Sequence, residues 1–229
     1  STSFLGVFQK VKAKSLHFPK LLALTSDDCG VSHSRQAWIM MEAGINFIQL
    51  RSKSLSAERL RVEAQAAAKV AEERGAVLVV NDCPSLAADS RASGVHLGME
   101  DGSPERARKL LGDSAIIGRT VHSLAEARWV KEEGNCDYVG LGPYRTSQTK
   151  CELAPVLGHT EIVEIRSFLD PIPVYLIGGL ELPDFDLIGE LGVTGLAVCS
   201  ALSEREVFGS NLKAFVERAK AFIPVGAVS

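Results

Sequence analysis

The sequence lacks a paired cysteine motif, a strong charge excess of one sign and any long hydrophobic run. Its five cysteines are scattered and form no C-x-x-C pair, which argues against a disulfide framework or a zinc site and favours a reducing, cytoplasmic compartment. The 25 Lys and Arg residues nearly balance the 28 Asp and Glu residues, so we expect no nucleic-acid partner. No apolar run approaches the roughly 18 residues of a membrane span, so we expect no membrane partner.

Aromatic residues are also scarce, at 6% of the 229 residues, and Ala, Val, Leu and Ile make up most of the apolar content. This composition favours a core of helices packed on strands over an aromatic-rich sandwich. The first 20 residues contain four lysines and no acid, and we interpret residues 1–20 as a basic N-terminal arm. A transit peptide is the alternative, although this segment contains no arginine.

Short apolar runs alternate with helical patterns along the chain. Eight runs are typical of strands buried on both faces of a parallel sheet: Leu21–Ser26, Phe47–Arg51, Ala76–Asp82, Gly94–Gly98, Ala115–Thr120, Tyr138–Pro143, Val174–Gly179 and Gly195–Ser200. Between them, Ser103-Pro104-Glu105 and the pair Ser123 and Glu126 indicate helix starts. A helical stretch from Ala57 to Arg74 is expected to end at Gly75.

Eight strand–helix units without a linker predict a single (β/α)8 barrel, a TIM barrel, over residues 21–229. The alternative is a doubly wound open sheet, which needs a glycine-rich phosphate fingerprint after its first strand. Asp27-Asp28-Cys29-Gly30 follows that strand and does not match the fingerprint, so we favour the barrel.

Polar residues follow nearly every run, and a barrel gathers its chemistry at the carboxyl ends of its strands. Positive charge comes from Arg51, Lys53, Arg145 and Lys150. Asp82 and Asp101 come from neighbouring strands, so their carboxylates could share Mg²⁺ with phosphate oxygens. Gly178-Gly179 and Ser200 stand where barrels often build a backbone phosphate site. The set predicts a phosphorylated substrate, a diphosphate with metal.

Each of these features also has a simpler interpretation. Asp82 could cap the following helix, and Asp101 could be a turn residue before the next one. Arg51 and Lys53 could form a solvated loop, and His122 could be a packing histidine. The remaining candidates are Cys83 and Cys199, which we interpret as small buried residues rather than nucleophiles.

Seven segments in this order resemble the thiamine phosphate synthase family, also called thiamine phosphate pyrophosphorylases: IQLRSK, VVND, GVHLGMED, IIGRTVHS, DYVGLGPYRTSQTK, IGGL and AVCSAL. The resemblance spans about Leu21 to Leu202. It implies a (β/α)8 fold and a Mg²⁺-dependent transfer of the hydroxymethylpyrimidine group from its diphosphate to hydroxyethylthiazole phosphate. The products are thiamine phosphate and pyrophosphate, formed by a dissociative substitution without a protein nucleophile.

The resemblance also implies roles for the residues that match the motifs. The diphosphate would be held by Gln49, Arg51, Lys53 and Asn81, and Mg²⁺ by Asp82 and Asp101. The catalytic residues would be Lys150, Arg51 and Thr120, with Lys150 stabilising the departing pyrophosphate and Thr120 contacting it or the pyrimidine. The thiazole phosphate would lie near Ser147 and Thr149, in a cradle completed by Gly179, Cys199 and Ser200.

The chain departs from the family pattern in a few places. Cys83 stands where the family often has arginine, a charge that Arg145 could replace, while Thr120 and Ser147 keep the hydroxyl that the family has there. Two alternatives are a thiazole tautomerase-like barrel using His122 and a catalytically silent binder of thiamine precursors; the diphosphate residues favour the synthase. We also hypothesise a homodimer, since barrels of this size frequently dimerise, and a lid formed by the loop Arg145–Glu152.

Overall fold

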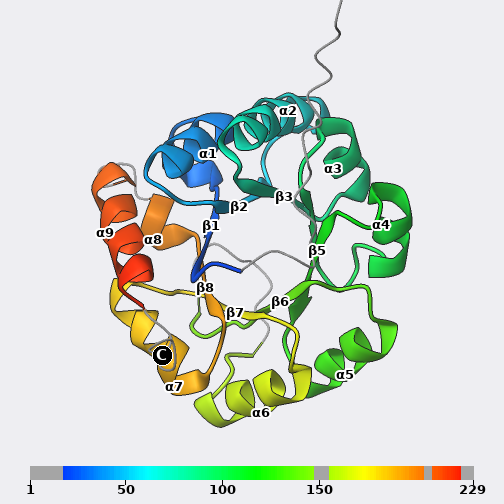
Figure 1. The fold of residues 1–229 in the computed structure, drawn as a ribbon, viewed down its shortest axis with the longest axis vertical. Coiled ribbons are helices and arrows are strands. Elements are labelled where there is room, and N and C mark those ends of the chain that lie inside the picture. Colours follow the sequence, from blue (N-terminus) through cyan, green and yellow to red (C-terminus); the bar gives the residue numbers. More distant parts are fainter. Residues whose placement is uncertain (1–17, 147–154, 204–207, 223–229) are drawn as a thin grey trace, which may run out of the picture.

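The computed structural model describes residues 18–146, 155–203 and 208–222. These residues form a closed barrel of parallel strands in the order β1 to β8, each hydrogen-bonded to its neighbours in the sequence (Figure 1). The strands are β1 Leu21–Leu24, β2 Phe47–Leu50, β3 Val77–Asn81, β4 Gly94–Leu97, β5 Ile116–Val121, β6 Tyr138–Leu141, β7 Val174–Ile177 and β8 Gly195–Val198. All eight predicted strands are confirmed, and pairing of Leu22 with Ala197 closes the barrel.

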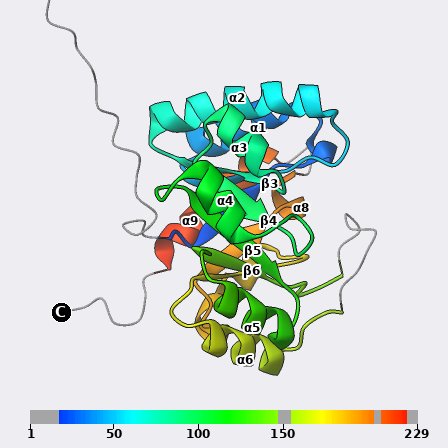
Figure 2. The same ribbon diagram turned by 90° about the vertical axis from the view of Figure 1, so that its right-hand side faces the viewer.

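Helices surround the barrel on its outside, as Figures 1 and 2 show. They are α1 His33–Glu42, α2 Ala57–Arg74, α3 Pro84–Ser90, α4 Pro104–Leu111, α5 Leu124–Glu133, α6 His159–Leu169, α7 Leu187–Leu191, α8 Ser200–Ser203 and α9 Phe208–Ala221. Two short 3-10 turns, η2 Asp27–Cys29 and η3 Leu182–Asp186, follow β1 and β7.

Local sequence explains where several helices begin and end. Ser103 and Ser123 cap α4 and α5 through their side-chain oxygens, as predicted. Gly75 ends α2 at a φ of 64°, a left-handed conformation that glycine adopts without strain. The capping box at Ser123 differs in one detail, because the Glu126 carboxylate accepts the backbone N–H of His122 instead of that of Ser123.

A small cluster of aromatic residues lies inside the barrel near the amino ends of the strands. Phe47, Tyr138 and Tyr175 have ring centroids 5.3 to 5.8 Å apart in edge-on pairs. Phe18 packs on all three, and the Tyr175 hydroxyl donates to the Pro19 carbonyl at 2.5 Å. These contacts close the amino end of the barrel. The layer between the strands and the helices consists mostly of small and aliphatic residues, with Phe185 and Phe215 packed edge-on among them.

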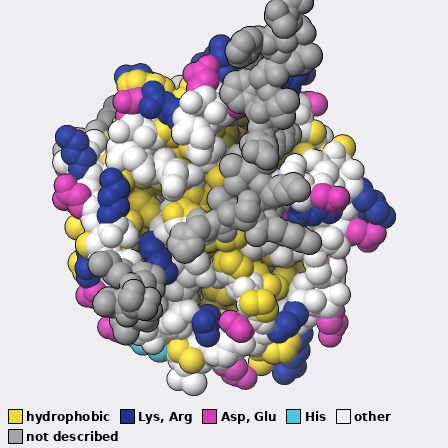
Figure 3. All heavy atoms as spheres, in the orientation of Figure 1, with side chains coloured by type: hydrophobic (Ala, Val, Ile, Leu, Met, Phe, Trp, Pro, Cys, Tyr) yellow, Lys and Arg dark blue, Asp and Glu magenta, His cyan; other side chains and the backbone are white. Residues whose placement is uncertain are grey.

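The surface view shows how charge is distributed over one face of the molecule. In Figure 3, Lys and Arg side chains alternate with Asp and Glu side chains round the rim, and hydrophobic side chains lie further in. This face therefore presents no broad field of one sign. Of the helices in the described ranges, none combines the length and the apolar character that crossing a bilayer requires.

Candidate active site

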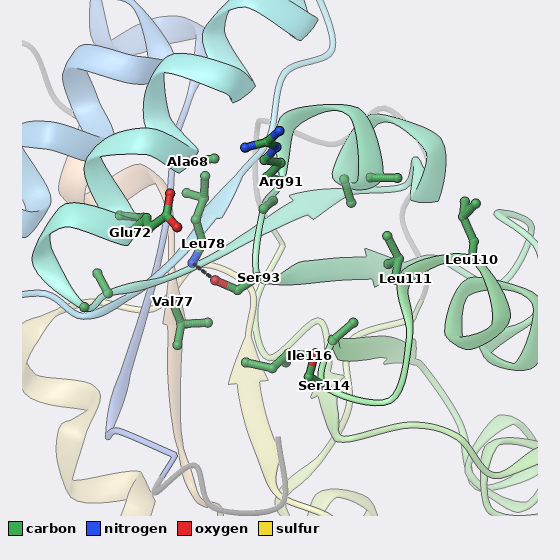
Figure 4. A pocket seen from close by; sticks show the side chains of 17 residues that line it. Ala68, Glu72, Val77, Leu78, Arg91, Ser93, Leu110, Leu111, Ser114 and Ile116 are labelled. Carbon is green, nitrogen blue, oxygen red and sulfur yellow. Dashed lines mark hydrogen bonds between the residues drawn. The ribbon is translucent and has the colours of Figure 1, made fainter. Parts of the chain in front are cut away.

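A pocket of about 330 Å³ opens at the amino ends of β3 to β5, between the ends of α2, α3 and α4 (Figure 4). Val77, Ser93 and Ile116 line it, and Ser93 accepts the backbone N–H of Leu78 at 3.1 Å. The predicted site residues end their strands and so lie toward the opposite end of the barrel. We therefore place the candidate site at the carboxyl ends of the strands, called the mouth below.

Two carboxylates meet at the mouth. Asp82 follows β3 with a φ of 66°, and its backbone N–H donates to the His96 carbonyl at 2.7 Å. The Asp82 carboxyl lies within hydrogen-bonding reach of Asp101; desolvation and this like-charged neighbour raise the pKa of Asp82 to about 6. Asp82 does not cap α3, because Cys83 occupies that position without a side-chain bond. Asp101 does make the turn contact, since it accepts the Gly98 N–H at 2.7 Å.

Arg51 and Lys53 lie on the same side of the mouth as this acidic pair. Both cations act electrostatically on Asp82 and counteract the rise of its pKa. Arg51, which follows β2, also acts electrostatically on Cys199, which follows β8. In the described part of the chain no carboxylate lies within 4.0 Å of either cationic group, which leaves both available for an anionic ligand.

A chain of hydrogen bonds crosses the barrel interior beneath the mouth. The buried His96 ring bonds the Thr120 hydroxyl through Nε2 and the Tyr138 hydroxyl through Nδ1, both at 2.9 Å. The buried Gln49 side chain lies beside the Tyr138 hydroxyl and acts against the rise in its pKa that burial causes. Gln49 and Thr120, two predicted site residues, are thus held by His96 and Tyr138, which the sequence analysis missed.

Mid-strand glycines were the signal that could have revealed His96. A Cβ on Gly118 would lie 2.4 Å from His96 Nδ1 and 2.2 Å from the Tyr138 ring. A Cβ on Gly140 would lie 3.3 Å from the same imidazole. Glycines inside β5 and β6 therefore provide the space for a large polar side chain that points inward from β4.

The sequence predicts that Arg145 supplies positive charge to the mouth, but the structure pairs it with another residue. Its guanidinium forms a two-pronged pair with Asp184 at 2.6 and 2.8 Å and donates to the Gly179 carbonyl at 2.9 Å. A Cβ on Gly179 would lie 2.9 Å from Arg145 Cβ, so the glycine allows this close packing. Arg145 therefore anchors the start of the loop after β6 and does not replace the charge missing at Cys83.

This pairing predicts a pH-dependent contribution to stability. Hydrogen bonds from Arg145 lower the pKa of Asp184 despite partial burial, so the ionised carboxylate stabilises the folded state. This contribution is present above the unfolded-state value of about 4 and is lost as the pH falls through the lower folded-state pKa. We expect Asp184→Asn to lower Tm at pH 7 and the difference from wild type to shrink toward pH 3. Thermal melts across this range measure it; a constant difference would contradict the assignment.

The remaining predicted residues are placed only in part. Asn81 ends β3, Ser200 begins α8, and Cys199 precedes it with its thiol 3.9 Å from the Thr25 carbonyl. Cys199 is half-buried rather than buried, and desolvation raises the pKa of its thiol, which argues against a nucleophile. His122 donates through Nδ1 to the Gly142 carbonyl, a packing contact. Ser147, Thr149 and Lys150, and most of the hypothesised lid, lie outside the described residues.

The carboxylates of Asp82 and Asp101 are suitable ligands for Mg²⁺. Among the described residues no three His, Cys, Asp or Glu side chains form a complete metal cage. Mg²⁺ does not need one, because it usually binds one or two carboxylates and completes its coordination with waters and substrate phosphates. Asp82 and Asp101 present two mutually repelling carboxylates beside cations that suit phosphate, so the donor set fits Mg²⁺ carried with a diphosphate.

Comparisons with known proteins show which family the chain resembles over most of its length. A family model described as thiamine monophosphate synthase matches residues 22–202. The thiamine-phosphate synthase of Flavobacterium psychrophilum is 36% identical over 170 residues, covering 72% of this chain and 82% of the relative. That of Bacteroides fragilis strain YCH46 is 35% identical, covering 75% and 85%. The structure of thiamine phosphate pyrophosphorylase from Pyrococcus furiosus superposes with a TM-score of 0.77 at 27% identity, covering 88% of this chain and 95% of that one.

Proposed function

The chain belongs to the thiamine monophosphate synthase family and is a transferase with thiamine-phosphate synthase activity, and we propose how its mouth carries out the reaction. The enzyme transfers the hydroxymethylpyrimidine group from its diphosphate to the ring nitrogen of hydroxyethylthiazole phosphate. Asp82 and Asp101 hold Mg²⁺, and Gln49, Arg51, Lys53 and Asn81 hold the diphosphate. The observation that carries this proposal is the paired carboxylates within electrostatic reach of Arg51 and Lys53.

The reaction needs charge stabilisation rather than a protein nucleophile. The bond between the methylene carbon and the diphosphate oxygen breaks, and its electron pair leaves with pyrophosphate. The pyrimidine stabilises the resulting cation, and the lone pair of the thiazole nitrogen forms the new carbon–nitrogen bond. Bound Mg²⁺ supplies neutralisation of the developing phosphate charge. Arg51, Lys53 and Lys150 do the same from the protein, and the walls of the barrel exclude water from the cation.

The remaining residues orient the two substrates. The Thr120 hydroxyl, fixed by His96 at 2.9 Å, contacts the pyrophosphate or the pyrimidine. Ser147, Thr149, Gly179 and the Cys199-Ser200 backbone bind the thiazole phosphate. These roles follow the family motifs.

The test is an assay that supplies both precursors and follows thiamine phosphate and pyrophosphate together. We expect equal amounts of the two products with Mg²⁺ and none after EDTA, with activity restored by excess Mg²⁺. Folded protein that forms neither product would contradict the proposed reaction. Full turnover in EDTA would contradict the metal role of Asp82 and Asp101 alone.

A further inference from the structure

A second polar network lies beside the mouth and has no part in the roles given above. It joins Thr25 at the end of β1, Asp27 in η2 and His33 at the start of α1. His33 Nδ1 lies 2.8 Å from Thr25 Oγ1, and His33 Nε2 lies 3.0 Å from Asp27 Oδ1. Thr25 is 0% exposed and His33 4% exposed, while the Asp27 side chain is 25% exposed. The network therefore runs from the buried strand end to the surface of the mouth.

The chemistry of the three groups sets the direction of these hydrogen bonds. An ionised carboxylate only accepts, so His33 donates from Nε2 to Asp27. His33 Nδ1 contacts the Thr25 hydroxyl, which is also placed to donate to the Arg51 carbonyl at 3.3 Å. That hydroxyl oxygen accepts the backbone N–H of Arg51 at 3.0 Å. One continuous chain of hydrogen bonds thus leads from the Arg51 amide to the Asp27 carboxylate.

Asp27 also accepts hydrogen bonds from the loop that follows β2. Its Oδ1 accepts the Ser52 hydroxyl at 2.5 Å, and its Oδ2 accepts the backbone N–H of Lys53 at 2.8 Å. Although burial acts in the opposite direction, these bonds and that from His33 lower the pKa of Asp27, so the carboxylate is ionised at neutral pH. The backbone is therefore held at residue 51 and again at residue 53.

This arrangement holds the peptide backbone and leaves the two cationic groups for a ligand. Asp27 takes the main-chain N–H of Lys53, not its ammonium group. Fixing the backbone at alternate residues orients both side chains at lower entropic cost when an anion binds. A carboxylate that paired with the Lys53 ammonium would instead compete with phosphate.

From this geometry we infer that Thr25, His33 and Asp27 form a positioning network that orients Arg51 and Lys53 toward the diphosphate. The identity of the ligand rests on the proposed function, but the positioning itself rests on the contacts above. None of the three is a catalytic residue, because they act through the loop.

The test compares Asp27→Asn with Asp28→Asn, a neighbour in η2 that makes the same charge change. Within the described residues, Asp28 hydrogen-bonds through its backbone N–H to Ser26 and not through its carboxylate. We expect Asp27→Asn to raise the KM for the pyrimidine diphosphate and the Kd for Mg²⁺-pyrophosphate by about tenfold or more, as for other groups that orient ligand-binding residues. The KM for the thiazole phosphate should change little, whereas Tm should fall at pH 7, because the lowered pKa of Asp27 means that its carboxylate stabilises the folded state. Asp28→Asn should leave all four near wild type.

Hydrogen exchange gives a readout that does not depend on turnover. The amides of Arg51 and Lys53 should exchange faster in Asp27→Asn. Asparagine keeps one uncharged acceptor oxygen, for which the Lys53 N–H must compete with the donors from Ser52 and His33, and the Thr25 acceptor of the Arg51 amide becomes less ordered. If Asp27→Asn does not fold, Ser52→Ala removes one donor to Asp27 and should shift the same constants by a smaller factor.

The outcomes separate this inference from the proposed function. Wild-type protein that neither binds Mg²⁺-pyrophosphate nor turns over overturns the proposed function and the diphosphate as ligand, and hydrogen exchange then still tests how the loop backbone is held. Wild-type binding with unchanged constants and unchanged exchange in the Asp27 and Ser52 variants overturns the positioning network alone. Equal weakening of both substrates in folded Asp27→Asn protein would also overturn it, since general destabilisation does not distinguish the two substrates.

Discussion

Replacing Asp82 by asparagine is expected to lower the rate of thiamine phosphate formation by about 10²–10³-fold while leaving Tm unchanged or higher. The rate falls because one of the two carboxylates proposed to hold Mg²⁺ is lost. Stability does not fall, because the substitution removes one of two like charges at the mouth, the repulsion that raises the pKa of Asp82. Asparagine also tolerates the left-handed backbone at φ 66°.

The measurement pairs kcat over a Mg²⁺ titration with thermal melts in metal-free buffer. Asp89→Asn is the matched control, because it removes the same charge from the exposed face of α3, away from the strand end. We expect the control to retain wild-type activity and Tm. Normal turnover of Asp82→Asn at low Mg²⁺ would exclude Asp82 as a ligand, and a large fall in its Tm would identify a structural role instead.

Replacing Lys150 by alanine is expected to have an effect of similar size, about 10²–10³-fold on kcat. This lysine follows the Ser147 and Thr149 motif positions and is proposed to neutralise the pyrophosphate as its bond breaks. Because that charge develops in the transition state, kcat should fall more than the KM for either substrate rises. A point charge rather than a fork suffices there, so Lys150→Arg should recover part of the activity.

Steady-state kinetics of both substrates measure this split between kcat and KM. Lys69→Ala, an exposed lysine of α2, is the matched control for loss of one positive charge. We expect the control to match wild type. Near-normal turnover of Lys150→Ala would remove Lys150 from the catalytic residues, and a rise in KM alone would limit its role to ground-state binding.

Several features of the fold could be predicted from local sequence because they depend on neighbouring residues. The apolar runs identified the strands, and serine caps and Gly75 set helix ends at Ser103, Ser123 and Arg74. The Glu126 carboxylate accepts the backbone N–H of His122 and not that of Ser123. This choice of partner could not be predicted, because it depends on the path of the chain entering α5.

The sequence could predict at which end of the barrel the site lies. Parallel strands in a closed barrel bring their carboxyl ends together, so listing the residues after each strand was enough to place Arg51 and Asp82 near each other. The ion pair between Arg145 and Asp184 could not be predicted from the sequence, because 39 residues separate the two and only the packing of η3 brings them together.

The sequence by itself determined the barrel, the order of its strands and the end at which polar groups collect. The spacing of apolar residues and the helix caps are encoded within a few residues, and the order of the strands follows from the alternation of strands and helices along the chain. Only the tertiary structure decided which polar groups meet there. The contact of His96 with Tyr138 joins residues 42 apart, and that of Asp27 with Lys53 joins residues 26 apart. Such pairs depend on strand register and side-chain direction across the barrel, and neither is written in any one segment.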